Sequence, residues 1–302
     1  MRVTEGQEAI DATEGDAAAA VFAHERRRLF GIAYRMLGTV ADAEDMVQEA
    51  WIRWQHTDRT VINEPAAFLT TVTTRLCINE VQSAHSRRET YIGPWLPEPV
   101  NTEGDPLLGA ERGEALQFAV LLLLEKLTPT ERAAYVLREA LDYPYERIAA
   151  IVQSTVPTAR QLVSRARKHL TEGRRATVPA NEHRRLLETF LSAAQSGNVS
   201  ALEELFASDV VSYTDGNGVK LAARIPVSGR ERVAKFIAAF SNHFWTGKII
   251  GWVQINGQPA ATLSENGVVT TAVTVTATAD GIGQLLWVMS PEKLHHVVPA
   301  GA

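Results

Sequence analysis

The chain has 302 residues, of which 45% are hydrophobic and 22% charged, and it carries a net charge of −5 and one cysteine. This is enough for two or three folded domains. The single cysteine excludes an intramolecular disulfide and a cysteine-rich zinc site, and the negative charge argues against indiscriminate binding to nucleic acid. Without a signal pattern or an apolar run near the about 20 residues of a membrane span, we expect a cytoplasmic protein that does not bind membranes.

The N-terminal third has the pattern of packed helices. Residues 1–16 are polar and acidic and are expected to be a disordered tail. Apolar residues then recur at helical spacing over 17–37, and Gly38-Thr39 separates this helix from the next. The second helix has one apolar stripe, made of Ala43, Met46, Val47, Ala50, Trp51 and Trp54. Its other faces carry Asp42, Asp45, Gln48 and Glu49, which suit a protein partner because acidic side chains repel phosphates.

A polar loop over 56–64 leads to Pro65 and a long helix that ends near Arg88, with Cys77 as a core residue. Residues 91–109 contain four prolines and three glycines, so we interpret 91–110 as a linker. The linker holds Trp95 and Leu96 between prolines, which suggests that it docks on a neighbouring surface.

Residues 144–170 predict a helix-turn-helix that ends in a basic helix. Thr155 is a good N-cap, and Pro157 lies in the first turn, where its missing N–H costs little. The second helix should bury Ala159, Leu162, Val163, Ala166 and Leu170. It leaves Arg160, Gln161, Ser164, Arg165, Arg167 and Lys168 to solvent, the composition of a helix that reads the major groove. The alternative is an ordinary solvated charged helix.

Charge is distributed unevenly along the chain. Residues 1–50 carry ten acidic and five basic side chains, whereas residues 151–180 carry one and six. This segregation favours a protein-binding face separate from a basic face for DNA, although clustering by chance is the other interpretation.

After residue 181 the pattern changes to α+β. Helices are expected at 182–196, 199–206 and 229–240. Strands are expected at 208–213, 219–223, 248–255, 259–264, 267–277 and 283–289, with Asn-Gly and Asp-Gly turn signals between the later ones. Helices followed by an antiparallel meander predict an α+β domain of about 120 residues.

Together these segments resemble the bacterial extracytoplasmic-function (ECF) RNA polymerase sigma factors that carry a fused C-terminal SnoaL-like domain. The acidic helix at 42–54, the helix with Arg75 and Asn79, and the helix-turn-helix follow in the order of that family. The group also has three short motifs, which here read Trp95-Leu96-Pro97-Glu98-Pro99, Asp215-Gly216-Asn217-Gly218-Val219-Lys220 and Ser290-Pro291-Glu292-Lys293-Leu294. The second motif is one residue longer before its lysine than the family pattern.

The resemblance implies a multidomain fold with two all-α sigma domains, the second a helix-turn-helix, followed by an α+β cone-shaped barrel. Sigma region 2 would occupy 17–90, the linker 91–110, sigma region 4 residues 111–172, a second linker 173–180 and the SnoaL-like regulatory domain 181–302.

The resemblance also implies roles for particular residues. Asp42, Asp45, Gln48 and Glu49 would bind the clamp helices of the largest subunit of core RNA polymerase. Asn63, Arg75, Asn79, Arg87 and Arg88 would contact the −10 promoter element, whose opening requires capture of a flipped base. Thr158, Arg160, Gln161, Ser164, Arg165, Arg167 and Lys168 would contact the −35 element. Trp95, Leu96, Pro97, Asp215, Gly216, Gly218, Lys220, Pro291, Lys293 and Leu294 would form an interdomain regulatory contact.

Two other classes remain open from the residues. One is a helix-turn-helix regulator with a ligand-binding domain, and the other is a SnoaL-like enzyme with a DNA-binding appendage. An enzyme could use Asp215, His243 or Asp280 in a pocket lined by Tyr213, Trp245, Trp252 and Trp287. Both aspartates precede glycine, as plain turn residues do. His295-His296 lacks a third metal ligand, and no triad, phosphate loop or dinucleotide motif is present. We therefore expect no catalytic residue, metal or cofactor, and leave a small-molecule ligand open.

Overall fold

The computed structural model describes residues 3–88, 90–102, 117–173 and 178–297, without the side chains of 3–16, 84–88 and 172–173. The chain divides into two compact units. The first contains residues 1–84 and 127–166, and the second contains residues 85–126 and 167–302. Within the described ranges, no helix has the length and apolarity needed to span a membrane.

The N-terminal helices of the first unit are α1 (Val3–Leu37), α2 (Val40–Gln55) and α3 (Pro65–Arg88), with a short 3-10 helix, η1 (Arg59–Val61), before α3. Thr39 caps α2 by accepting the backbone N–H of Asp42 at 3.3 Å. The apolar stripe of α2 packs into a core with Leu29, Leu69 and Leu76. These three helices form the N-terminal helical domain.

The disordered tail expected at residues 1–16 is wrong from Val3 onward. Helix α1 begins at Val3 and continues without interruption into the helix expected at 17–37. Residues 3–16 contain no proline and lead into four consecutive alanines at 17–20. Because alanine is the strongest helix former, a helix that includes this run extends readily toward the N-terminus.

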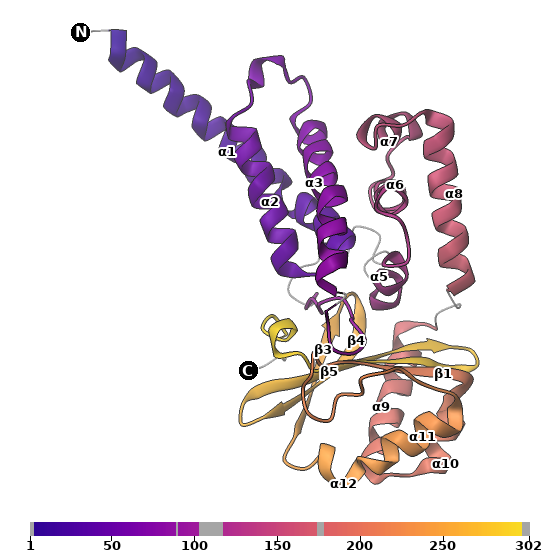
Figure 1. Ribbon diagram of the computed structural model, residues 1–302. Helices are drawn as coiled ribbons and strands as arrows, with labels where there is room; N and C mark the ends of the chain where they lie inside the picture. The colour runs from indigo at the N-terminus through magenta and orange to yellow at the C-terminus, as the bar shows by residue number, and fades with distance from the viewer. Residues whose placement is uncertain (1–2, 89, 103–116, 174–177, 298–302) are drawn as a thin grey trace. The chain divides into compact units, whose positions relative to one another are not determined.

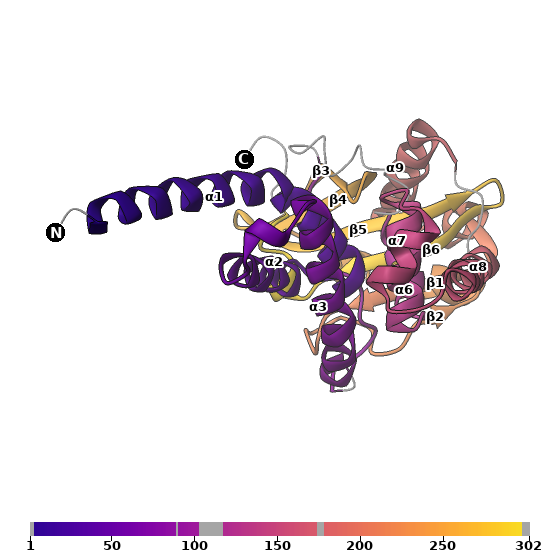
Figure 2. The same ribbon diagram turned by 90° about the horizontal axis from the view of Figure 1, so that it is seen from above.

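The helix-turn-helix domain consists of α6 (Pro129–Glu139), α7 (Tyr145–Ile151) and α8 (Val156–Gly173), which lie side by side in Figures 1 and 2. Thr128 and Glu131 form a complete capping box at the start of α6, with Pro129 in the first turn. Ala134, Leu137, Ile148 and Ala159 join the core that holds the three helices together.

The second unit is built on one six-stranded sheet with the order β2-β1-β6-β5-β4-β3. Strands β1 and β6 are parallel and the other neighbours are antiparallel. The strands are β1 (Phe206–Asp215), β2 (Val227–Ser228), β3 (Ile249–Ile255), β4 (Gln258–Glu265), β5 (Val268–Thr278) and β6 (Gly281–Val288). The helices are α5 (Phe118–Leu124), α9 (Ala180–Ser196), α10 (Val199–Leu205), α11 (Arg230–Ala239), α12 (Ser241–Phe244) and the 3-10 helix η3 (Pro291–Lys293).

The two faces of the sheet have different covers. Helices α9 to α12 lie on one face, as Figure 1 shows, and bury Phe190, Phe206 and Trp287 against it. The opposite face forms a second core with Leu96, with Phe118 of α5, and with Leu294 and Val297 after the last strand. Segments that come before the first strand and after the last strand in sequence therefore complete the core of the sheet.

The expected closed barrel is wrong, because the sheet is open. One edge strand, β2, has only two residues. The other edge strand, β3, pairs with the end of the linker: Thr102 donates its N–H to the Gln254 carbonyl, and Asn256 to the Val100 carbonyl, both at 2.9 Å. A strand edge that is short or covered in this way does not need a closed barrel to satisfy its hydrogen bonds.

One further expectation differs from the structure. The strand expected at 219–223 is a pair of turns, closed by hydrogen bonds from the Val219 N–H to the Gly216 carbonyl and from the Ala222 N–H to the Val219 carbonyl. Helix α5 lies within the segment expected to be sigma region 4, and its Phe118 and Leu122 pack on the sheet. Residues 103–116, which include most of the second half of the linker, lie outside the described residues.

Candidate nucleic-acid interface

The candidate recognition helix is α8, and it has the two faces that its sequence predicts. Ala159, Leu162, Val163, Ala166 and Leu170 are buried, whereas Arg160, Gln161, Ser164, Arg165, Arg167 and Lys168 are exposed and Thr158 is half-buried. Thr155 caps the helix by accepting the Thr158 N–H at 3.3 Å. Gln153, in the turn before α8, has a positive φ of 54°, which lets α7 end and α8 start in a new direction. The result is a short helix with a basic outer face.

Neighbouring side chains order part of that basic face. The Arg160 guanidinium lies 5.4 Å from the centre of the Tyr145 ring, which attracts the cation. Arg165 lies 3.3 Å from Glu131, the buried residue of the α6 capping box. Both arginines are thus held in position by helices of the same domain. Contacts with bases or phosphates would have to replace or share these contacts.

The polar face of α2 is acidic and mostly open to solvent. Asp45 and Gln48 are exposed. Asp42 accepts a hydrogen bond from the Thr39 hydroxyl at 2.6 Å, and Glu49 pairs with Arg53 at 3.0 Å one turn later on the same helix. This face is separated from the buried stripe of the helix, so it can contact a partner without changing the core.

The candidate contacts for the −10 element are in three different situations. Asn63 and Asn79 are exposed, in the loop before α3 and on α3 itself. Arg75 is engaged, because its guanidinium donates to the carbonyls of Ala150 and Ile151 at the end of α7, both at 3.0 Å. The side chains of Arg87 and Arg88, at the end of α3, lie outside the described residues. In the loop itself, Asp58 caps η1, and the hydrogen bonds from Thr60 lower the pKa of its carboxyl.

The three short motifs of the second unit meet at one buried ion pair. Asp215, at the end of β1, is fully buried and lies 2.6 Å from the Lys293 ammonium. Asp215 also accepts the Leu96 N–H at 2.7 Å and the Tyr91 hydroxyl, and Lys293 donates to the Leu96 carbonyl. The Lys293 ammonium lies 4.3 Å from the centre of the Trp95 ring and 4.9 Å from that of Tyr91. We call these five residues the Asp215 cluster.

The Asp215 cluster satisfies both of its buried charges. Burial and the neighbouring Asp215 carboxylate together raise the pKa of Tyr91, so its hydroxyl remains a hydrogen-bond donor. The carboxylate has three donors and the ammonium has two oxygen partners and two aromatic faces, which offset the cost of removing both charges from water. The cluster therefore fixes the 91–96 segment against the sheet.

The glycines after Asp215 are required by the geometry of the loop. A Cβ on Gly216 would lie 2.3 Å from the Cβ of Ala222, a distance that no side chain tolerates. Gly218 has a φ of +85°, which L side chains rarely adopt. Lys220 is exposed, and Pro291 starts η3, which carries Lys293. The loop thus positions Asp215 and leaves the lysine of its own motif in solvent.

The residues considered for catalysis do not come together. Asp215 has all of its hydrogen-bond partners within the cluster, while His243 is exposed on α12 and Asp280 is exposed in the turn between β5 and β6. His295 and His296 are exposed, and the described part of the chain contains no group of three residues that could hold a metal ion.

Of the aromatic residues expected to line a pocket, Trp245 and Trp287 line a cavity between α11, α12 and the sheet, together with Phe236, Phe240 and Phe244. The volume of about 40 Å³ is room for about three water molecules, and Tyr213 and Trp252 do not line it.

Sequence reasoning missed Tyr91, Arg28 and Tyr143. Tyr91 donates to Asp215 from 124 positions away, and Arg28 bonds the Tyr143 hydroxyl across 115 positions. No local pattern marks such residues. The one available signal was the position of Tyr91 beside the aromatic and proline-rich segment.

The family models and the relatives that match this chain are all of sigma factors. Residues 21–87 match the model for Sigma-70 region 2, and residues 117–170 match that for Sigma-70, region 4. The ECF RNA polymerase sigma factor SigJ of Mycobacterium tuberculosis is 40% identical over 228 residues, which cover 74% of this chain and 72% of that protein. A probable ECF RNA polymerase sigma factor of the same species, SigI, is 30% identical over 286 residues, covering 93% and 96%.

The solved structures include a relative of similar extent. The crystal structure of the Mycobacterium tuberculosis extracytoplasmic function sigma factor SigJ has a TM-score of 0.74 and 32% identity, and it covers 92% of this chain and 98% of that chain. The two chains therefore share one fold over most of their length. This chain belongs to the ECF RNA polymerase sigma factors, which bind core RNA polymerase and direct transcription initiation from specific promoters.

Proposed function

We propose that this sigma factor binds the clamp helices of the polymerase through the acidic face of α2, contacts the −10 element through α3 and the preceding loop, and reads the −35 element through α8. The observation that carries this assignment is the separation of charge between two exposed helix faces. Asp45 and Glu49 lie off the buried stripe of α2, and the basic side chains of α8 lie off its buried seam. An acidic face fits a basic protein partner, and a basic face fits DNA.

We further propose that the C-terminal domain regulates initiation in cis and has no catalytic role. The Asp215 cluster holds the linker at 91–96, and Phe118 of α5 packs on the opposite face of the same sheet from the α9–α12 layer. Both ends of the connection between the two DNA-contacting domains are thus attached to one body. The exposed His243 and Asp280 do not form a catalytic set, which supports a regulatory role. The protein would act in the cytoplasm, where the chromosome and the polymerase are.

Docking limits how far the two DNA-contacting domains can separate. A released segment from 89 to 117 has 29 residues and could span about 100 Å when fully extended, at about 3.4 Å per residue. When residues 90–102 are docked, the 15 residues from 103 to 117 could span about half of that. Since the promoter elements have a fixed spacing, docking would favour some promoters over others.

Run-off transcription with purified core polymerase tests the assignment. Core polymerase alone should not initiate at a specific site, and addition of the chain should produce discrete transcripts. A helix-turn-helix regulator would instead change transcription only by a polymerase that already holds a sigma factor. Discrete transcripts that require a second sigma factor would therefore contradict the proposed function.

Trp95→Ala tests the regulatory part. This variant removes the aromatic face that contacts Lys293 and should change promoter-dependent transcription several-fold. Trp252→Ala is a matched control, because Trp252 also contacts a cation, the Arg184 guanidinium at 3.7 Å, but lies outside the Asp215 cluster. Truncation after residue 180 should shift transcription in the same direction as Trp95→Ala, although it also exposes Leu96 and Phe118. Equal activity of the Trp95 variant, the truncated chain and the full-length protein would contradict regulation in cis.

A further inference from the structure

Tyr145 connects the scaffold of the helix-turn-helix domain with the basic face of α8. It is the first residue of α7, and its half-buried side chain packs against the core of the domain. The guanidinium carbon of Arg160, on α8, lies 5.4 Å from the centre of the Tyr145 ring, and that of Arg138, on α6, lies 5.1 Å from it. Both distances are within the about 6 Å over which an aromatic face attracts a cation. One ring therefore contacts an arginine from each of the other two helices.

The turn between α6 and α7 holds Arg138 in place. Its guanidinium donates to the Tyr143 carbonyl at 2.9 Å and lies 3.5 Å from the Asp142 carboxylate. Asp142 has a φ of 55°, and its N–H donates to the Arg138 carbonyl at 3.1 Å, which closes the turn at the end of α6. Because Asp142 offsets the charge of Arg138, the two arginines can share the Tyr145 ring with little mutual repulsion. Arg138 and the core contacts together hold the ring in one orientation.

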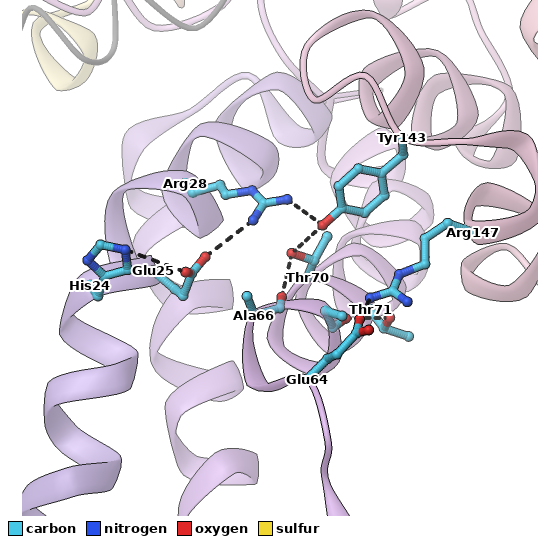
Figure 3. Close-up of polar contacts among 10 residues, drawn as sticks. His24, Glu25, Arg28, Glu64, Ala66, Thr70, Thr71, Tyr143 and Arg147 are labelled. Atoms are coloured by element: carbon cyan, nitrogen blue, oxygen red, sulfur yellow. Dashed lines mark hydrogen bonds and ion pairs between the residues drawn. The ribbon is translucent and has the colours of Figure 1, made fainter.

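The side chains near Tyr145 in the same segment serve a different surface. Figure 3 shows Tyr143 and Arg147 pointing toward the N-terminal helices. The Arg28 guanidinium of α1 lies 5.2 Å from the centre of the Tyr143 ring, and Arg147 forms an ion pair with Glu64. Of the two tyrosines, Tyr143 therefore contacts α1 and Tyr145 contacts α8.

The contact with Tyr145 leaves Arg160 able to read a base. An aromatic face attracts the charge of a guanidinium but supplies no oxygen or nitrogen acceptor, and within the part of the chain that the structure describes no group accepts a hydrogen bond from Arg160. Arg165 differs, because it lies 3.3 Å from the Glu131 carboxylate, which offsets its charge. Arg160 also lies near the start of α8, which begins at Val156. Residues near the start of a recognition helix contact base edges, and the commonest specific contact of arginine is with O6 and N7 of guanine.

We infer that Tyr145 is a positioning residue for promoter recognition, and that its ring holds the Arg160 guanidinium in the orientation that binds a guanine of the −35 element. This inference rests on the proposed reading of the −35 element by α8. A flexible side chain loses rotamer freedom when it binds a base, and a side chain that an aromatic ring already holds loses less. The guanine contact requires two N–H groups to be aligned at once, so Tyr145 contributes more to the preference for guanine than to the overall affinity for DNA.

Substitutions at position 145 separate the aromatic face from its packing and from its hydroxyl. Tyr145→Leu removes the face and keeps an apolar side chain for the core. Tyr145→Phe keeps the face and removes only the hydroxyl, so it should retain the wild-type preference. Pentafluorophenylalanine at this position keeps the shape of the ring but withdraws electron density from its face, so it should behave like Tyr145→Leu. Tyr143→Leu is the matched control, since Tyr143 is also half-buried beside the same core and contacts an arginine of a different helix.

The measurement is the relative affinity of the holoenzyme, formed from core polymerase and the full-length chain, for duplexes that differ at one base pair of the −35 element. The wild-type holoenzyme first selects the preferred element from duplexes with a randomised upstream region. Arg160→Ala identifies the guanine, as the position at which preference falls about tenfold or more. At that position Tyr145→Leu should lower the preference for guanine over adenine about fivefold, which is about 1 kcal/mol at about 1.4 kcal/mol per factor of ten. Replacement of this guanine by 7-deazaguanine, which lacks the N7 acceptor, should weaken binding by the wild type more than binding by Arg160→Ala.

A double variant shows whether the ring acts through the arginine. Tyr145→Leu combined with Arg160→Ala should lose no more preference than Arg160→Ala alone. The inference is overturned if Tyr145→Leu keeps the wild-type preference or weakens binding to all sequences alike, or if the two substitutions are additive. It is also overturned if Tyr145→Phe or Tyr143→Leu loses the preference as Tyr145→Leu does, or if pentafluorophenylalanine retains it. An Arg160→Ala variant with wild-type preference at every position would refute the proposed reading by α8, whereas an effect of Arg160→Ala without one of Tyr145→Leu would refute only the role of Tyr145.

Discussion

Replacement of Lys293 by Met removes the cation of the Asp215 cluster while keeping most of the side-chain volume. Asp215 is fully buried, and without Lys293 its carboxylate keeps only the Leu96 N–H and the Tyr91 hydroxyl. Removal of one partner from a buried ion pair typically costs about 3–5 kcal/mol, because the remaining charge is uncompensated. Since domain stabilities are about 5–15 kcal/mol, a loss of this size is a large part of the stability of the C-terminal domain.

Thermal unfolding of the full-length chain measures this effect. For a domain of this size, about 1 kcal/mol corresponds to about 3–5 °C in Tm, so Lys293→Met should lower the transition of the C-terminal domain by about 10–20 °C. The double variant with Asp215→Asn carries no buried charge at the site and should recover a substantial part of the loss, giving a coupling of more than about 1 kcal/mol. A Tm within 3 °C of the wild type, or additive losses in the double variant, would refute the account of Asp215 and Lys293 as a mutually dependent buried pair.

Three other predictions concern α2, α8 and the buried His183. Asp45→Arg with Glu49→Arg should weaken association with core polymerase without changing the unfolding transition; co-elution equal to that of the wild type would contradict it. Arg160→Ala should cost about 1–3 kcal/mol of DNA-binding free energy and relax the preference at one base position, whereas Lys168→Ala should weaken binding to all DNA sequences alike and reduce the slope of log affinity against log salt by about one. Equal losses of affinity for all sequences in filter-binding titrations of both variants would show that α8 does not read bases. His183 is buried, and burial lowers the pKa of its imidazole in the folded protein. As the pH falls, the imidazole is therefore protonated in the unfolded chain before it is protonated in the folded one. Stability of the C-terminal domain should thus be full above about pH 6.5 and fall below it by up to about 1.4 kcal/mol per pH unit, and His183→Gln should flatten that dependence in urea titrations.

Features that depend on neighbours within a few turns of helix were predictable from the amino-acid sequence alone. The buried seam of α8, the apolar stripe of α2 and the caps at Thr39 and Thr155 are where periodicity and capping chemistry place them. The family and the class of fold were also predicted, because the three short motifs occur in order along the chain. Apolar periodicity, helix caps and short motifs are local signals, because all of the residues that define each one lie within a single helix or a short stretch of sequence.

Contacts between groups that are distant in sequence were visible only in the folded chain. Arg75 had the residue type of a DNA contact, yet its guanidinium bonds carbonyls of α7, 75 and 76 positions away. Lys293 reaches Asp215 across 78 positions, and α5 joins the sheet although it precedes the helix-turn-helix in sequence. The open sheet likewise depends on the linker at 100–102 covering the β3 edge. These outcomes depend on which surfaces the folded chain brings together to satisfy buried charges, helix ends and strand edges, and no short-range pattern specifies that pairing.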